Sequence, residues 1–286
     1  MNNIPKKVLA IHDLSTYGRC SLGVIIPILS VMGLQVCSLP AAVLSTHTGG
    51  YNDFYMQGLS EFIKQSCEHF KTLSVSFDAV YSGFLAGADQ IDQLRYIIDT
   101  YKYALILIDP VMGDNGKVYK TYTKELCELM KKLVKKADII TPNLTECSIL
   151  LDIPYKNETL TDEYIKDMLL KLNSMGPSQI VVTGIRNCED IINAAYDKNL
   201  NKFYKIKSNY KPIHYPGTGD IFSSVLLSEI LLDKPLDTAL KSATEFIDYC
   251  INITPEKDYD HREGVLLENA LIKLINKSDS LKIIEF

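Results

Sequence analysis

The chain has 286 residues, a length that accommodates one large α/β domain or two small ones. Hydrophobic residues make up 47% of it and charged residues 23%, which is ordinary for a globular enzyme. The formal net charge of −5 leaves no basic footprint, so we expect no nucleic-acid partner.

Short strand-like segments alternate with helical ones along most of the chain. The strand-like segments are apolar or β-branched and are bounded by polar residues or glycine. In chain order we predict strands at residues 8–11, 35–39, 79–82, 104–108, 138–141 and 179–183. Helical periodicity predicts helices at residues 53–70, 89–101, 124–136 and 162–175. This alternation predicts βαβ units and a mostly parallel sheet with helices on both faces.

The pattern changes after Thr183. Two further strands, at residues 191–196 and 202–207, are expected to form a meander around a polar turn. Helices are then predicted at residues 220–232, 236–252 and 266–275. Because no linker, low-complexity tract or internal repeat interrupts the chain, we expect residues 1–286 to form one domain.

The cysteines and the apolar segments indicate the compartment. Seven cysteines are scattered singly without a CxxC pair, so neither a zinc site nor a full disulfide framework is indicated. The start of the chain, residues 1–7, does not resemble a signal peptide. The longest apolar stretch, residues 23–34, contains Pro27 and is too short to span a bilayer. We therefore expect a cytoplasmic protein without a membrane partner.

Polar motifs follow the predicted strands. In sheets of this kind, ligands bind beyond the carboxyl ends of the strands. The motifs at these positions are His12-Asp13, Ser45–Gly50, Ser82–Phe84, Asp109–Asp114 and Thr141–Glu146.

The segment Gly217-Thr218-Gly219-Asp220 precedes a strongly apolar stretch. Its glycines let the backbone approach a ligand, and the free N–H groups of the following helix attract an anion. Asp220 lies at the same end, where a carboxylate can take a proton from a group that attacks phosphate. The alternative is a plain turn with Asp220 as the helix cap.

Three carboxylates follow the later strands. Asp109, Asp114 and Glu146 are suited to Mg²⁺ beside a polyphosphate, because this hard ion takes few protein oxygens and many waters. Simpler explanations are that Asp109 caps a turn before Pro110, that Asn143 caps the next helix and that Asp114 is a turn residue.

Four segments occur in order over nearly the full length, at residues 41–51, 108–114, 137–146 and 217–220. Together they resemble the ribokinase-like superfamily, specifically its vitamin B6 kinases. The resemblance implies an α/β fold, a three-layer αβα sandwich with a mostly parallel central sheet. It also implies ATP-dependent phosphorylation of the 5′-hydroxymethyl group of pyridoxal, pyridoxamine or pyridoxine. ATP, Mg²⁺ and a homodimer are part of that expectation, and a monovalent cation such as K⁺ is left open.

The resemblance also assigns site residues. Asp220 is the expected general base, and Gly217, Thr218 and Gly219 form the expected anion hole. The substrate-binding residues are expected to be Asp13, His47, Thr48, Phe84 and Asp220. The nucleotide-binding residues are expected to be Asp109, Asn143, Glu146, Thr183, Gly184 and Thr218. The metal-binding residues are expected to be Glu146, Asp109 and Asp114.

Two positions depart from the family pattern, and two others have simpler explanations. Many members have serine in place of Asp13 and tyrosine in place of Phe84, which leaves the preferred vitamer open. His47 is equally explained as a hydrogen-bonded structural histidine. The pair Thr183-Gly184 is nearly as well explained as a plain turn.

The segment Lys207–Tyr215 joins the meander to the anion-hole loop. We expect it to cover the nucleotide and keep water from the γ-phosphate. Three lysines are candidates for screening the phosphates, Lys207 and Lys211 within the segment and Lys205 just before it. An ordinary surface connection is the alternative.

Other functions remain as alternatives. A hydroxymethylpyrimidine kinase of thiamin synthesis shares the fold and the base, but its glycine-rich N-terminal loop is absent because Asp13–Gly18 has one glycine. A P-loop enzyme is excluded because no G-x-x-x-x-G-K-[ST] motif exists. A catalytically silent protein that binds B6 vitamers is the alternative from another class, although binding alone needs no base.

Overall fold

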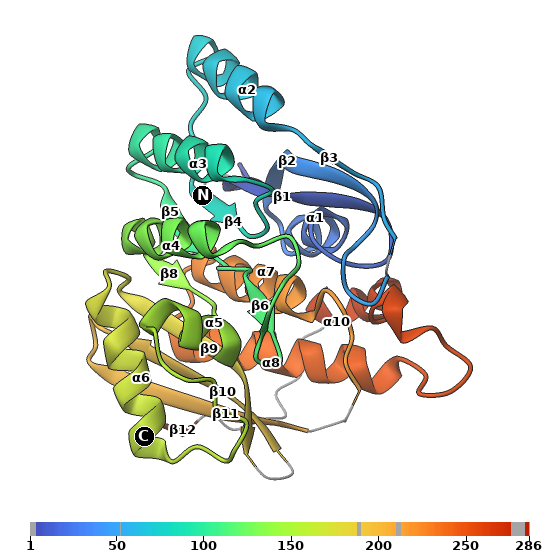
Figure 1. Ribbon diagram of the computed structural model, residues 1–286, viewed down its shortest axis with the longest axis vertical. Coiled ribbons are helices and arrows are strands. Elements are labelled where there is room, and N and C mark those ends of the chain that lie inside the picture. The colour runs from blue at the N-terminus through green and yellow to red at the C-terminus, as the bar shows by residue number, and fades with distance from the viewer. Residues whose placement is uncertain (1–3, 52, 188–189, 210–212, 276–283, 286) are drawn as a thin grey trace.

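The computed structural model describes residues 4–51, 53–187, 190–209, 213–275 and 284–285. Its strands are β1 (Lys7–Tyr17), β2 (Gln35–Thr46), β3 (Met56–Gly58), β4 (Ala79–Ser82), β5 (Leu105–Ile108), β6 (Gly113–Asp114), β7 (Lys117–Val118), β8 (Ile139–Ile140), β9 (Gln179–Asn187), β10 (Asp190–Asp197), β11 (Lys202–Asn209) and β12 (Ile284–Glu285). Ten of them form one sheet in the order β12-β11-β10-β9-β8-β5-β4-β1-β2-β3 (Figure 1). Pairing is parallel from β2 through β1, β4, β5 and β8 to β9, and antiparallel at both ends.

Helices cover both faces of this sheet (Figure 1). One face carries α2 (Ser60–Thr72), α3 (Ala88–Thr100), α4 (Lys124–Leu133) with η1 (Val134–Lys136), α5 (Leu144–Leu151) and α6 (Asp162–Ser174). The other carries α1 (Leu22–Val31), α7 (Thr218–Leu231), α8 (Leu236–Ile253), α9 (Leu267–Ala270) and α10 (Ile272–Ile275). A short turn of helix, η2 (His261–Glu263), precedes α9. The predicted three-layer α/β architecture is therefore confirmed.

Local sequence accounts for the helices that flank the site. Thr123 caps α4 by accepting a hydrogen bond from the Leu126 amide, and the apolar side chains of this helix face the sheet. Helix α7 is different, because nearly every residue from Ile221 to Leu231 is buried. A helix that is buried on every side lies inside the molecule, and α7 packs between α1 and α8. The predicted base at its start is therefore carried by an immobilised element.

Several predicted element boundaries are wrong. Strand β1 continues to Tyr17 and β2 to Thr46, so His12 and Asp13 lie within a strand and not after it. The helix predicted from residue 53 begins only at Ser60, because residues 56–58 pair with β2 as strand β3. Sheet pairing there overrides the local helical pattern.

The cysteines of the described residues form no disulfide bonds. Cys20, Cys37, Cys67, Cys127, Cys147 and Cys250 are all free thiols. Cys188 lies outside the described residues. Over the ranges that the structure covers, no helix is both long and apolar enough to cross a membrane.

The sheet order locates the place where a ligand is expected. Strand β1 lies between β2 and β4 in the sheet. The chain therefore forms β2 on one side of β1 and later returns to form β4 on its other side. Such a reversal leaves a crevice at the carboxyl ends of the two strands. His12 and Gly83 meet at this point, because the Gly83 amide bonds to the Ile11 carbonyl of β1.

The packing of Gly83 against His12 is testable. A Cβ at position 83 would lie 2.5 Å from Nδ1 of the fully buried His12 ring, so Gly83→Ala forces the strands apart. We expect a loss of about 1–3 kcal/mol in the free energy of unfolding, measured by urea denaturation. Gly23→Ala is the matched control, because no atom lies within 4 Å of its added Cβ. Equal stability of the two variants would contradict this packing.

Candidate active site

The turn before α7 presents free backbone N–H groups. Gly217 is the N-cap of α7 and has a left-handed backbone with φ 80°. A Cβ at this position would lie 2.1 Å from the Arg19 carbonyl oxygen, so glycine is required both for the conformation and for the close approach. Thr218 bonds back to the Tyr215 carbonyl through its hydroxyl, at 3.1 Å. These contacts fix an N-terminal helix end of the kind that holds anions.

Asp220 is the third residue of α7 and not its cap, so the capping alternative is wrong. Its Oδ2 accepts a hydrogen bond from the Ser21 amide at 2.9 Å. The side chain is 14% exposed, and burial raises the pKa of its carboxyl to about 7. The Ser21 amide lowers this pKa, while the negative charge of Asp13 raises it. A carboxylate with a pKa near neutrality is suited to accept a proton in catalysis.

Asp13 is buried in β1 at a break in its register with β2. Such irregularities redirect a side chain out of the regular alternation of the strand. Its oxygens accept hydrogen bonds from the Ser21 hydroxyl at 2.6 Å and the Ser15 hydroxyl at 3.1 Å. Burial raises the pKa of the Asp13 carboxyl, and the two hydroxyls lower it.

His12 lies beside the predicted base. Its Nδ1 is 3.8 Å from Oδ1 of Asp220, and neither ring nitrogen has a hydrogen-bond partner. Burial lowers the pKa of His12 to about 3, and the nearby Tyr81 backbone acts in the opposite direction. The imidazole is therefore neutral. It packs edge-on against the Tyr81 ring, with 4.3 Å between the ring centroids.

His47 is held by two backbone groups. Its Nε2 is 2.6 Å from the Arg262 carbonyl, and its Nδ1 accepts from the Gly49 amide at 3.1 Å. These partners assign the proton to Nε2 of a neutral ring. Burial lowers the pKa of His47, and the Arg262 carbonyl acts in the opposite direction. His47 is thus hydrogen-bonded as the structural explanation expects, and its ring also lines the pocket described below, so its contact with the substrate stays a prediction.

Asn143 and Glu146 form a capping box at the start of α5. The Asn143 side chain accepts from the Glu146 amide, and Glu146 Oε2 accepts from the Asn143 amide at 2.8 Å. Glu146 Oε1 also accepts from the Met112 amide at 3.2 Å. The capping explanation of Asn143 is confirmed. Burial raises the pKa of the Glu146 carboxyl, and the charge of Asp109 raises it further.

The other two predicted metal residues lie in different surroundings. The Asp109 carboxylate is buried, and the Ser223 hydroxyl lies 3.4 Å from its Oδ2. Burial raises the pKa of this carboxyl, and Asp220 raises it too. Asp114 ends strand β6 of a hairpin with β7, and it accepts from the Asn115 amide at 2.8 Å. Asp114 is thus the strand residue directly before a turn at residues 115–116, and its role at a metal stays a prediction.

Thr183 and Gly184 lie within β9, so the plain-turn explanation is wrong. Gly184 has φ 69°, and its amide donates to the Asn193 side chain at 3.0 Å. Phe84 is buried and faces Tyr122 edge-on, with 6.5 Å between the ring centroids.

The sequence-predicted site residues all line one pocket of about 460 Å³. They are Asp13, His47, Thr48, Phe84, Asp109, Asp114, Asn143, Glu146, Thr183, Gly184, Gly217, Thr218, Gly219 and Asp220. Their segments are far apart in the chain and meet at the carboxyl ends of the parallel strands (Figure 1). Within the described ranges, no three His, Cys, Asp or Glu side chains are close enough together to hold a metal ion.

The expected cover over the nucleotide is described only in part. Lys211 lies in residues 210–212, outside the described residues. Lys205 pairs with Asp162 at 2.5 Å and Lys207 with Asp190 at 2.5 Å, so both side chains have acidic partners. Their role in screening phosphates stays a prediction.

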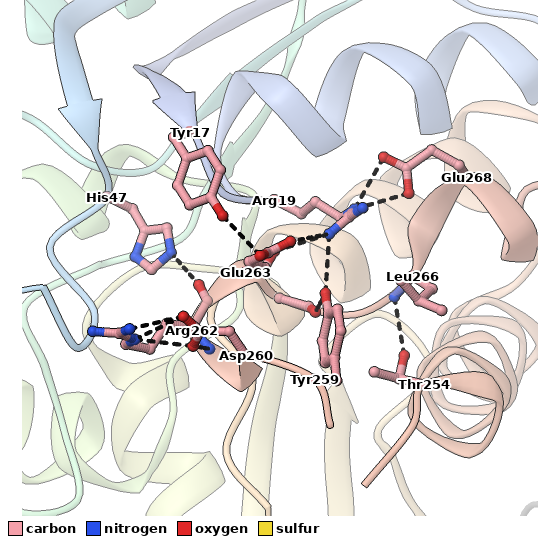
Figure 2. Close-up of polar contacts among 11 residues, drawn as sticks. Tyr17, Arg19, His47, Thr254, Tyr259, Asp260, Arg262, Glu263, Leu266 and Glu268 are labelled. Atoms are coloured by element: carbon pink, nitrogen blue, oxygen red, sulfur yellow. Dashed lines mark hydrogen bonds and ion pairs between the residues drawn. The ribbon is translucent and has the colours of Figure 1, made fainter. Parts of the chain in front are cut away.

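A polar network joins the end of β1 to residues 259–268, which we call the 259–268 segment (Figure 2). Arg19 donates through its amide to the Glu263 carbonyl at 3.0 Å. Its guanidinium Nε lies 2.8 Å from a Glu268 carboxylate oxygen, and its Nη1 is 3.0 Å from the Tyr259 hydroxyl. Through Arg262 the same segment holds His47 (Figure 2). It therefore anchors both the residues before α1 and the loop after β2.

Ser21 is the main site residue that the sequence patterns missed. It lines the pocket and contacts both Asp13 and Asp220. The available signal was a serine directly before the apolar helix α1, which indicates only a cap.

Comparison with known proteins identifies the family. The family model for phosphomethylpyrimidine kinase matches residues 27–264. A Bacteroides thetaiotaomicron protein, provisionally assigned as a phosphomethylpyrimidine kinase and crystallised with pyridoxal, is 41% identical. The match covers 99% of this chain and 100% of that protein, with a TM-score of 0.95. The chain therefore belongs to the phosphomethylpyrimidine kinase family.

Other relatives have two different activities. The pyridoxal kinase of Lactobacillus plantarum is 27% identical with a TM-score of 0.87, covering 95% of this chain and 97% of that one. The hydroxymethylpyrimidine/phosphomethylpyrimidine kinase of Staphylococcus aureus is 28% identical over 62% of this chain. The chain spans 64% of the staphylococcal enzyme and 42% of a bifunctional thiamine-biosynthesis enzyme of Arabidopsis thaliana. Family membership therefore does not decide between pyridoxal and hydroxymethylpyrimidine as the substrate.

The burial of Asp220 predicts a pH-dependent stability change. Its pKa rises from 3.8 to about 7 on folding, so folding becomes less favourable as the pH climbs between these values. Asp220→Asn removes that cost and still accepts from the Ser21 amide. In ligand-free protein we expect urea unfolding to show a gain of about 1–2 kcal/mol near pH 8 and less near pH 5. The exposed Asp89→Asn serves as control, and a gain independent of pH would be inconsistent with this burial.

Proposed function

We propose that the protein is an ATP-dependent kinase that phosphorylates the 5′-hydroxymethyl group of pyridoxal, pyridoxamine or pyridoxine. The observation that carries this proposal is the shared pocket, where Asp220 lies at the exposed N-terminus of α7 and Asp13 lies nearby. The 41% identical relative crystallised with pyridoxal supports a B6 vitamer as substrate. Roles in vitamin B6 salvage, in the cytoplasm and as a homodimer stay predictions from the resemblance.

In the proposed reaction Asp220 accepts the proton of the substrate hydroxymethyl group. The freed oxygen forms a bond to the γ-phosphorus of ATP while the bond to the bridging oxygen breaks, and ADP leaves. The N–H groups of residues 217–219 hold the transferring phosphoryl group, because the helix end is positive where negative charge accumulates. Asp13 receives the substrate ring, with its remaining acceptor capacity facing a ring donor.

The nucleotide and its Mg²⁺ are proposed to lie toward Asp109, Asn143 and Glu146. Two buried carboxylates with raised pKa values, Asp109 and Glu146, are stabilised in their charged forms by a nearby cation, so the donor set fits a divalent ion. Both Glu146 oxygens already accept backbone hydrogen bonds, which favours contact through a metal-bound water. When bound, Mg²⁺ neutralises phosphate charge. Asp114, Thr183, Gly184 and Thr218 complete the proposed nucleotide side, and K⁺ stays a prediction.

A hydroxymethylpyrimidine kinase is the second candidate, favoured by the staphylococcal relative. Its substrate also presents a hydroxymethyl group to a base at position 220. The single glycine in residues 13–18 is the feature of this chain that opposes it. A silent B6-binding protein is disfavoured because binding alone does not need a carboxylate such as Asp220 at the helix end.

The proposal is tested by ATP consumption with four substrates. We expect pyridoxal, pyridoxamine or pyridoxine to be turned over at higher kcat/KM than hydroxymethylpyrimidine, with phosphate recovered on the substrate by mass spectrometry. The reverse order supports the second candidate, and binding without turnover supports the silent protein.

Loss of the base should abolish this turnover. Asp220→Asn is expected to lower kcat by about 10²–10⁴-fold while vitamer binding, measured by calorimetry, persists. In the wild type kcat/KM should rise with pH through about 7, because Asp220 must lose its proton to act. Asp89→Asn should behave as wild type. Near-normal kcat in Asp220→Asn would remove this role.

Glu146 is expected to affect the metal requirement. Glu146→Gln removes a negative charge near the proposed ion, so the Mg²⁺ concentration for half-maximal activity should increase by about tenfold. Excess Mg²⁺ should restore part of kcat. The exposed Glu125→Gln is the matched control, and thermal unfolding checks the capping box. A Mg²⁺ titration that matches wild type in a folded variant would argue against the assignment.

A further inference from the structure

Ser21 has a backbone conformation that side chains rarely adopt. Its φ is 47° and its ψ is −135°, a region favoured by glycine, and only 7% of the residue is exposed. Strained residues persist only where their surroundings hold them, and they concentrate at functional sites.

The hydrogen bonds of Ser21 differ from those of an ordinary cap. A serine at the N-cap normally uses its hydroxyl to accept from an amide of the first helical turn. Ser21 is the N-cap of α1 but makes no such bond. Its hydroxyl instead donates to Asp13 at 2.6 Å, and its amide donates to Asp220 at 2.9 Å. The residue therefore gives up its capping bond to contact two carboxylates of the pocket.

Neighbouring contacts hold this conformation in place. Arg19 is anchored to the 259–268 segment through its amide and its guanidinium (Figure 2). On the other side, the Arg19 carbonyl packs against Gly217, the cap of α7. The chain entering Ser21 is thus fixed between the anion-hole turn and the 259–268 segment, which accounts for how the strain is maintained.

We propose that Ser21 is a positioning residue that joins Asp13, the acid proposed to receive the substrate ring, to Asp220, the proposed base. This inference rests on the proposed function. The single residue between the two carboxylates transmits a displacement of Asp13 to Asp220, so the ring and the hydroxymethyl group are aligned together. Ser21 itself touches neither the phosphate nor the reacting oxygen in this account.

Two substitutions separate the hydroxyl from the strain. Ser21→Ala removes the bond to Asp13 and keeps a side chain at positive φ, whereas Ser21→Gly removes the same bond and relieves the strain. Loss of a hydrogen bond to a charged group predicts a fall of about tenfold or more in kcat/KM for the vitamer in both variants. KM for ATP should stay within about twofold of the wild-type value. The thermal unfolding midpoint of Ser21→Gly should be higher than that of Ser21→Ala, because glycine relieves the strain. Ser30→Ala, on the exposed face of α1, is the matched control.

Retention of wild-type kcat/KM by both Ser21 variants would overturn the proposal. So would an equal rise in KM for ATP and for the vitamer, because a general structural defect affects both substrates. A fall in vitamer kcat/KM with an unchanged KM for ATP supports the positioning role.

A double-mutant cycle keeps the inference testable without activity. Unfolding free energies of Asp13→Ala, Ser21→Ala and the double variant give the coupling between the two side chains. We expect the double variant to lose less than the sum of the two single losses, and additive losses would overturn the link. If wild type turns over neither B6 vitamers nor hydroxymethylpyrimidine, the proposed function fails, while the cycle still decides whether Ser21 and Asp13 are joined.

Discussion

The concentration of buried carboxylates at one edge of the sheet is the constraint on which this site depends. Burial raises the pKa of four carboxyl groups, those of Asp13, Asp109, Glu146 and Asp220. Their negative charges also act on one another. Asp13 raises the pKa of Asp220, Asp220 raises that of Asp109, and Asp109 raises that of Glu146. Each group is destabilising when ionised unless something compensates it. Part of that compensation comes from N–H and O–H donors, such as the Ser21 amide on Asp220. The divalent cation proposed above would add to that compensation.

Part of the site was predictable because several of its residues follow strands, namely His47, Phe84, Asp109 and Asn143. Parallel strands bring their carboxyl ends to one edge, so a motif after each strand already implies a common pocket. Asp109 and Asp220 are 111 positions apart in the sequence, yet the charge of Asp220 raises the pKa of the Asp109 carboxyl. The roles of the two residues came from the family resemblance, and their proximity depends on where α7 begins, which the strand pattern does not determine. The helix predicted from residue 53 failed because β3 pairs with β2 there, a contact that local periodicity does not encode.

The contacts that escaped prediction link segments far apart in the chain. Ser21 and Asp220 are separated by 199 positions, and His47 and Arg262 by 215. Nothing in the local sequence around Ser21 distinguishes a capping serine from one whose hydroxyl is diverted to Asp13. Only the register break in β1 and the anchoring of Arg19 by the 259–268 segment bring these groups into contact. Such pairings depend on tertiary packing, which a single sequence does not reveal.

Glu146 shows how a structural role constrains a chemical one. Its two oxygens accept from the Asn143 and Met112 amides, so the capping box fixes the carboxylate and uses part of its acceptor capacity. A carboxylate held in this way acts on a nearby cation chiefly through charge and through an intervening water. This arrangement is consistent with the described residues having no cluster of three metal ligands. Capping and electrostatic stabilisation are therefore compatible in one side chain, and the explanation of Asn143 and Glu146 as a cap does not exclude their proposed place beside the nucleotide.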